Sequence, residues 1–247
     1  MAEILVIREK DRFTSVLIEQ GFSVINFPVI KTEPLKDLSE LESYLAEIET
    51  FDGIFVTSVI ATEILLAKLC ETRKNFHGKF FVLGKRSDDL LKQSGYKTFF
   101  SEQATTAKEL LELIPKKVLK NKRFLFPRGN RSLRVVSEML QNIAEVCEAV
   151  VYQTLDAETD ERKLIEIKEK LANEKINVVC FFSPSAVERF LSKFEKFLQN
   201  KIKVAVVGKT TANFAEANNL RVDFVSTKPS ADDFAALLGN FLRRLRN

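Results

Sequence analysis

Short runs of apolar residues alternate along the chain with longer stretches of helical period. The apolar runs predict buried strands at residues 4–7, 24–30, 53–56, 80–83, 98–100, 123–126, 149–153, 178–182, 204–207 and 222–225. Between them, apolar residues at i, i+3 and i+4 predict helices along residues 35–48 and 234–245, with shorter helices at 14–20 and 132–141. This alternation is typical of an α/β fold with parallel sheets.

The sequence contains an internal repeat. IFVTSVIATEIL (54–65) aligns with VCFFSPSAVERF (179–190), so that Ser58 matches Ser183 at an offset of 125 residues. KFFVLGKRSDDLL (79–91) aligns with KVAVVGKTTANFA (203–215), and TTAKELLELI (105–114) aligns with PSADDFAALL (229–238), both at an offset of 124. Three matches in order indicate two similar α/β domains.

The two copies are unequal, and the difference predicts how the domains connect. The first copy continues into RFLFPRGN (123–130) and a helix, whereas the matching strand and helix of the second copy stand at the N-terminus as ILVIREKDRF (4–13). We therefore expect residues 1–30 and 157–247 to form one discontinuous domain and residues 36–148 an inserted one. The linkers, about 31–35 and 149–156, would form a two-stranded hinge with a ligand-binding cleft between the domains.

Small hydroxyl residues and glycines follow the predicted strands. Ser58 and Ser183 stand where helix N-caps are expected, and Gly84 and Gly208 occupy matching places in the two copies. The first N–H groups of a helix bind carboxylates or phosphates. Simple capping explains each loop taken alone, but four such loops at one end of two domains favour a ligand with several negative charges.

Composition and charge narrow the class of protein. With 45% hydrophobic and 29% charged residues, the 247-residue chain is neither disordered nor fibrous. No apolar run approaches the ~18 residues that span a bilayer, and the N-terminus does not resemble a leader, so we expect a cytoplasmic protein without a membrane partner. A net charge of +4 argues against a dedicated nucleic-acid binder. The three cysteines lack a CxxC spacing and are expected to be buried free thiols.

Several catalytic motifs are missing. The single histidine, His77, and the lack of clustered carboxylates predict no metal site, and neither a Walker loop nor a GxGxxG fingerprint occurs. Arg8 and Arg128 each follow an apolar run, where carboxylate binding and loop stabilisation fit equally well. Tyr152 lies in the second predicted linker, and taken alone it is explained by packing.

FFSPSAVERF, VAVVGKTTA, LFPRGN, VYQT and FVTS, taken together, resemble the uroporphyrinogen-III synthase family over essentially the whole chain. The resemblance implies two flavodoxin-like parallel-sheet domains joined by a two-stranded linker, with a cleft between them. It also implies a monomeric lyase without cofactor or metal that cyclises hydroxymethylbilane to uroporphyrinogen III, with loss of water and inversion of the D ring. The preceding enzyme of the pathway would be a candidate partner that hands over the substrate.

The resemblance also assigns roles to residues. It implies that Tyr152 is the catalytic acid that assists departure of the hydroxyl group. The candidates for substrate binding are Arg8, Thr57, Ser58, Gly84, Arg128, Gly129, Ser183, Ser185, Lys203, Gly208, Thr210 and Thr211.

Two other functions fit parts of the pattern. A non-catalytic two-domain binding or regulatory protein for an anionic ligand would use the same hinge and loops. A flavodoxin-like nucleotide binder would need a phosphate loop richer in glycine and serine than any in the chain.

Overall fold

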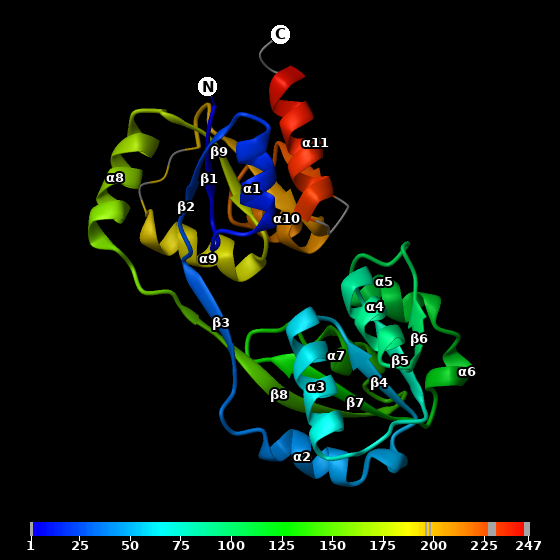
Figure 1. Cartoon of the computed structure of the whole chain (residues 1–247). Helices are drawn as coiled ribbons and strands as arrows, with labels where there is room; N and C mark the ends of the chain where they lie inside the picture. The colour runs from blue at the N-terminus through cyan, green and yellow to red at the C-terminus, as the bar shows by residue number, and fades with distance from the viewer. Residues whose placement is uncertain (1, 196, 198, 227–230, 245–247) are drawn as a thin grey trace. The chain divides into compact units, whose positions relative to one another are not determined.

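The alternating pattern corresponds to two mainly parallel sheets with helices on both faces, in a computed structural model that describes residues 2–195, 197, 199–226 and 231–244 (Figure 1). The chain divides into two units, each with one sheet. Unit 1 comprises residues 1–31 and 155–247, and unit 2 comprises residues 32–154. Pro229 and Leu245, which belong to the predicted repeat and the last predicted helix, lie outside the described residues.

The sheet of unit 1 has the strand order β11-β10-β9-β1-β2, and each adjacent pair of strands is parallel. The strands are β1 (Glu3–Val6), β2 (Ser23–Asn26), β9 (Ile176–Phe181), β10 (Lys203–Val207) and β11 (Phe224–Ser226). Numbered along the chain within this unit, the order is 2-1-3-4-5, which is that of flavodoxin-like folds. The predicted α/β fold class is confirmed.

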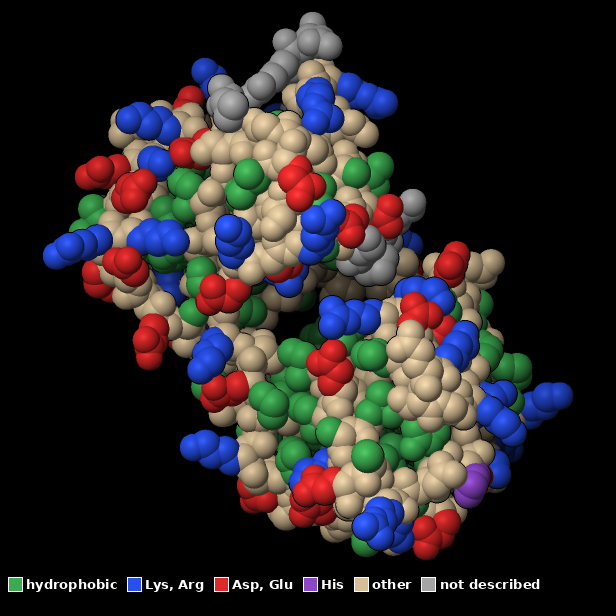
Figure 2. All heavy atoms as spheres, viewed as in Figure 1, with side chains coloured by type: hydrophobic (Ala, Val, Ile, Leu, Met, Phe, Trp, Pro, Cys, Tyr) green, Lys and Arg blue, Asp and Glu red, His purple; other side chains and the backbone are tan. Residues whose placement is uncertain are grey.

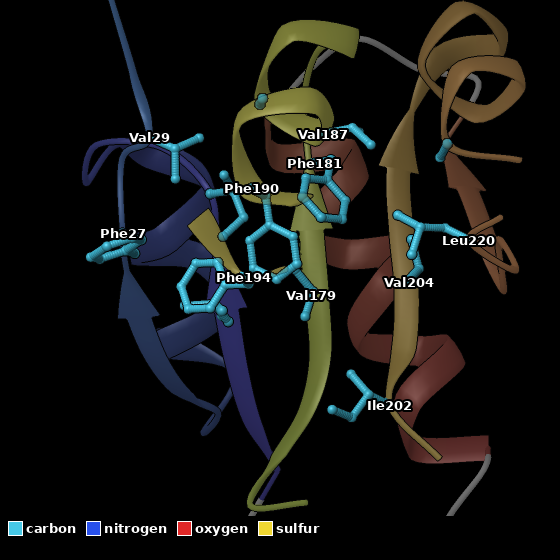
Figure 3. Close-up of a cluster of buried hydrophobic side chains, with 14 of the residues drawn as sticks. Phe27, Val29, Val179, Phe181, Val187, Phe190, Phe194, Ile202, Val204 and Leu220 are labelled. Carbon is cyan, nitrogen blue, oxygen red and sulfur yellow. The ribbon is translucent and has the colours of Figure 1, made fainter. Parts of the chain in front are cut away.

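Helices cover both faces of this sheet because successive strand residues point to opposite sides. Val179 and Phe181 belong to one buried cluster with residues of α8 (Glu161–Ala172), α9 (Pro184–Lys193) and α10 (Gly208–Ala217). Figure 3 shows the part of this cluster where Phe190 of α9 lies beside Phe181 and Phe194. Val178 and Cys180 face α1 (Arg12–Glu19) and α11 (Ala231–Arg244). Burial on both faces explains why these strands are apolar throughout.

The sheet of unit 2 has the order β3-β8-β7-β4-β5-β6. Its strands are β3 (Ile30–Pro34), β4 (Gly53–Val56), β5 (Lys79–Val82), β6 (Lys97–Phe100), β7 (Arg123–Gly129) and β8 (Glu145–Asp156). The strands β8, β7, β4, β5 and β6 are parallel and occupy the places that β2, β1, β9, β10 and β11 have in unit 1. The two sheets therefore have the same spatial order, but the chain enters them at different strands.

The helices of unit 2 also form two layers. On one face, Ile54 and Val56 contact α2 (Ser39–Ala46), the 3-10 helix η1 (Ile48–Thr50), α3 (Val59–Glu71) and α4 (Lys85–Gln93). On the other, Phe55 stacks on Phe81 at a centroid distance of 4.9 Å, next to α5 (Ala107–Leu113), α6 (Lys116–Leu119) and α7 (Val135–Leu140). The two buried clusters therefore pack on opposite faces of the parallel strands, and the ends of these strands carry the candidate site.

Two hydrogen-bonded strands connect the units. Leu35 donates its N–H to the carbonyl of Val151, and Ala157 donates to the carbonyl of Val29, so β3 and β8 run antiparallel. The boundary between the units falls within both strands.

Three of the differences between the predicted elements and the structure have a clear local cause. The strand predicted at 24–30 is interrupted after Asn26, where Pro28 has no N–H to donate. The helix predicted from Leu35 begins only at Ser39, since Leu35 instead continues the pairing with β8. The helix predicted at 132–141 begins at Val135, because Ser132 closes a turn onto Gly129.

The cysteine prediction is partly wrong. Cys180 is buried in the sheet of unit 1, Cys147 is half-buried, and Cys70 is exposed near the end of α3. Burial raises the pKa of the Cys180 thiol far above its ordinary range. Cys70 therefore stands in solvent as a free thiol.

Candidate functional site

The carboxyl edge of the unit 2 sheet collects most of the candidate residues of that unit. The chain leaves β4 toward β5 and leaves β7 toward β8, so the strand order reverses between β4 and β7. Ligands of open parallel sheets bind outside the carboxyl ends of the strands at this reversal. Thr57 and Ser58 follow β4, and Arg128 and Gly129 end β7 on its other side.

Two helices begin at this edge with different caps. Ser58 is the N-cap of α3, and its Oγ accepts a hydrogen bond from the Ala61 N–H at 3.2 Å. Gly84 precedes α4 at a φ of +95°, and no side chain caps that helix. At the start of α3 the Val59 and Ile60 N–H groups precede the capped Ala61, and α4 begins without a side-chain cap, so N–H groups at both starts are available to an anion.

Tyr152 lies within β8, opposite Gly129 at the end of β7, where Ser132 closes a turn onto Gly129. The Tyr152 hydroxyl is 3.3 Å from Ser132 Oγ, which accepts the Gly129 N–H at 3.0 Å. The ring covers Gly129 closely enough that a Cβ there would lie 2.3 Å from Tyr152 Cε2. The phenol is half-buried and its hydroxyl has a fixed neighbour at the sheet edge.

Arg128 stabilises this turn through hydrogen bonds to Glu148 and to the Gly129 carbonyl. Its Nε donates to Glu148 at 2.8 Å and its Nη1 donates to the Gly129 carbonyl at 2.9 Å, with only 12% of the side chain exposed. Burial acts to raise the pKa of Glu148, but hydrogen bonds from Ser137, Arg134 and Arg128 outweigh it and hold that pKa below its ordinary value. Of the two roles predicted for Arg128, these contacts favour loop stabilisation.

The carboxyl edge of unit 1 repeats the arrangement, with the reversal between β1 and β9. Ser183 is the N-cap of α9 and accepts the Ala186 N–H at 3.2 Å, while its Oγ lies 3.1 Å from that of Ser185. Arg8, just after β1, pairs with Asp11 at 3.0 Å, and its guanidinium lies 4.4 Å from the centre of the Phe182 ring. Arg8 and the two serines therefore lie at the carboxyl ends of two adjacent strands, β1 and β9.

The third loop of unit 1 begins α10 with Gly208 at a φ of +74°. Thr210 is half-buried, whereas Thr211 is only 3% exposed and points into the core. Of these two predicted binding residues, Thr211 can therefore offer its backbone but not its hydroxyl.

Lys203 is not brought together with the other candidates. It begins β10, at the opposite edge of the sheet, and its Nζ pairs with Asp223 at 3.1 Å. Its repeat partner Lys79 likewise begins β5. The matched lysines thus mark equivalent strand starts rather than the carboxyl edge.

Sequence reasoning missed two features. Ser132 was not a candidate, although the Gly-Asn-Arg-Ser turn after β7 could have indicated it. A cavity of about 570 Å³ lies in unit 1 beyond the end of β2, among Asn26, Phe27, three carboxylates and two lysines. The carboxylates Glu9, Glu158 and Asp160 outnumber Lys10 and Lys163, so this cavity suits an anion less well than the helix N-termini do.

Charge is mixed rather than concentrated. Figure 2 shows basic and acidic side chains interspersed on the visible face of each unit, so anion binding there depends on local groups more than on a broad basic field. Across the part of the chain that the structure describes, no cluster of metal-ligating side chains occurs. Within the same residues, no helix has the length and hydrophobicity to cross a bilayer.

Comparison with known proteins gives one consistent family. The family described as uroporphyrinogen-III synthase HemD matches residues 11–236. A uroporphyrinogen-III synthase of Chlorobaculum parvum is 26% identical, with 98% of this chain and all of the relative covered, and that of Schizosaccharomyces pombe is 22% identical, with 94% and 92% covered.

Solved structures agree on the fold. A mutant uroporphyrinogen III synthase of Thermus thermophilus superposes with a TM-score of 0.73 at 18% identity, covering all of this chain and 99% of that one. The uroporphyrinogen-III synthetase of Helicobacter pylori gives a TM-score of 0.60 at 20% identity, with 98% and 100% covered. The resemblance seen in the sequence motifs is confirmed.

Proposed function

Since the chain belongs to the uroporphyrinogen-III synthase family, we propose that it cyclises hydroxymethylbilane to uroporphyrinogen III with inversion of the D ring and loss of water. The observation that best supports the chemistry is the placement of Tyr152, whose hydroxyl lies beside Ser132 at the sheet edge where α3 and α4 begin. The alternative of a non-catalytic binding protein is not supported by the relatives, which are named as synthases.

The substrate's eight carboxylates would bind where the sheets end. The N–H groups at the starts of α3, α4, α9 and α10 supply donors, and Arg8 adds a cation beside α9. Because backbone donors survive side-chain truncation, Ser185→Ala should raise KM only slightly. Positioning the A and D rings for closure is the larger part of catalysis, since closure without inversion gives the other isomer.

Tyr152 would act as the general acid. As the C–O bond of the hydroxymethyl group breaks, the phenol passes its hydrogen to the departing oxygen and water leaves, which creates an azafulvene cation. To invert the D ring, its pyrrole first attacks this cation through the substituted α carbon, which has no hydrogen to lose, and forms a spirocyclic intermediate. The bond from that carbon to ring C then breaks, the inverted D ring closes through its unsubstituted α carbon, and the proton that this carbon loses restores the phenol. The electron-rich pyrroles supply most of the driving force, so loss of the phenol should slow turnover without abolishing it.

The test is Tyr152→Phe, which keeps the ring over Gly129 and removes only the hydroxyl. We expect turnover to fall about 10- to 100-fold, the effect of losing ~1.4–2.7 kcal/mol of transition-state stabilisation, with KM little changed. The assay measures formation of isomer III and quantifies isomer I as the uncatalysed background. Matched controls are Tyr44→Phe and Tyr96→Phe, the other two tyrosines of the chain, which should keep wild-type turnover. An unchanged rate for Tyr152→Phe would remove the phenol from the chemistry.

Location and assembly complete the proposal. An exposed free thiol such as Cys70 is better suited to a reducing compartment, which supports a cytoplasmic location. We propose that the protein works as a monomer and receives its unstable substrate from the preceding enzyme. Sedimentation of the protein alone, and with that enzyme, tests both points.

A further inference from the structure

The turn after β7 is built around the side chain of Ser132. The Ser132 N–H donates to the Gly129 carbonyl at 3.1 Å, and the Gly129 N–H donates back to Ser132 Oγ at 3.0 Å. The carbonyl of Gly129 is further held by Arg128. The serine oxygen is therefore fixed by a donor that cannot turn away, because that donor is a backbone group inside a closed turn.

The same turn is fastened to the strand that carries Tyr152. Asn130 donates its N–H to the Tyr152 carbonyl at 3.0 Å, and Asn130 Oδ1 accepts the Thr154 N–H at 2.9 Å. Both bonds join β8 just after the Tyr152 side chain, on its C-terminal side along the strand. Ser132 and Tyr152 thus belong to one rigid frame, so their hydroxyl oxygens keep the 3.3 Å separation that the structure shows.

The direction of the bond between the two hydroxyls decides what it can do. A serine hydroxyl has one donor hydrogen and two acceptor positions, and the Gly129 N–H takes one acceptor position. If Ser132 donates to Tyr152 Oη, the phenol's own hydrogen is free for the substrate, and the chain from Gly129 through Ser132 to Tyr152 polarises in one direction. The bond then strengthens as the phenol gives up its hydrogen, because its oxygen gains negative charge.

We propose that Ser132 is a positioning residue for Tyr152: it donates its hydroxyl hydrogen to the phenol oxygen and so directs the phenol's hydrogen to the leaving hydroxyl group. This proposal rests on the proposed role of Tyr152 as the acid. An interaction that is stronger in the transition state than in the bound substrate raises turnover rather than affinity.

The experiment is a double-mutant cycle with Ser132→Ala and Tyr152→Phe, with kcat and KM measured for isomer III formation. In the wild-type background, Ser132→Ala should lower kcat about 2- to 10-fold with KM nearly unchanged, the fold-change expected for one net hydrogen bond. Ser132→Thr keeps the hydroxyl and should restore kcat. In the Tyr152→Phe background, Ser132→Ala should have no further effect on kcat.

Asn130→Ala provides the control for a loosened turn, since it removes the side-chain bond to Thr154 and leaves the Ser132 hydroxyl in place. If Ser132→Ala lowers kcat equally in both backgrounds, as a merely structural role would, or has no effect beside Tyr152, the role of Ser132 is refuted while that of Tyr152 stands. If Tyr152→Phe alone keeps the wild-type rate, the role of Tyr152 is refuted, and the role of Ser132 with it.

Discussion

Gly129→Ala is the smallest change that should displace the candidate acid without touching it. The added Cβ would lie 2.3 Å from Tyr152 Cε2, 2.4 Å from Cζ and 2.8 Å from the hydroxyl oxygen, whereas ordinary contacts begin at 3.4 Å. The ring must therefore retreat by about 1 Å. Gly129 does not have a positive φ, so the backbone tolerates alanine and the whole effect arises from the ring.

The magnitude follows from that displacement. Forcing one methyl group into a packed site costs about 1–3 kcal/mol of folding free energy. A hydroxyl moved by about 1 Å loses its alignment, so we expect kcat to fall at least as far as in Tyr152→Phe, about 10- to 100-fold. Urea unfolding followed by circular dichroism measures the first quantity, and formation of isomer III measures the second.

A second variant isolates the cause. Tyr152→Ala removes the ring, so Gly129→Ala made in that background should cost almost no stability. Wild-type stability together with wild-type turnover in Gly129→Ala would show that the ring does not rest on Gly129 in solution. That result would remove the geometric basis for both Tyr152 and Ser132.

Three further outcomes are expected. In Gly208→Val the added Cβ meets no atom within 4 Å, but a β-branched residue is forced to a φ of +74°, so the folded state should lose about 1–2 kcal/mol and KM should rise. The control is Gly21→Val, at a φ of +85°, which should destabilise the fold to the same extent and leave KM unchanged. Glu148→Gln should lower the free energy of unfolding by about 1–3 kcal/mol at neutral pH. Because the folded-state pKa of Glu148 is lowered, the wild type loses this advantage as pH falls through that pKa, so the two unfolding free energies measured in urea should converge. A thiol reagent should label Cys70 rapidly and Cys180 only after unfolding, and fast labelling of Cys180 would contradict its burial.

Local pattern was sufficient for much of the fold and for part of the site. The strand ends that carry Ser58, Ser183, Gly84 and Gly208 could be predicted because apolar runs, N-cap residues and repeat spacing are all local properties. The carboxyl ends of parallel strands then lie at one edge by geometry alone.

Contacts distant in sequence explain the misses. Leu35 fits a helical pattern, but its N–H bonds to Val151, 116 residues later, and no local rule contains that partner. Ser132 lies 20 residues from Tyr152, and only the parallel pairing of β7 with β8 brings them together. Lys203 matches Lys79 in the repeat because each residue begins a strand, β10 and β5 respectively. Such a match shows an equivalent position in the fold and does not by itself indicate substrate binding.

The carboxyl edges of the two sheets are equivalent in position but differ in the functional groups that they carry. Each has a serine-capped helix, a glycine of positive φ and an arginine at the carboxyl end of a strand next to the reversal, Arg128 within β7 and Arg8 just after β1. They differ in the strand beside the arginine: β8 carries Tyr152 opposite Gly129, whereas Phe27, the aromatic residue directly after β2, is buried in the core and packs edge-on against Phe194. If both edges bind carboxylates but only unit 2 presents a hydroxyl for the chemistry, Gly208→Val must act mainly on KM and Gly129→Ala mainly on kcat. Equal effects of the two variants on both constants would contradict this division.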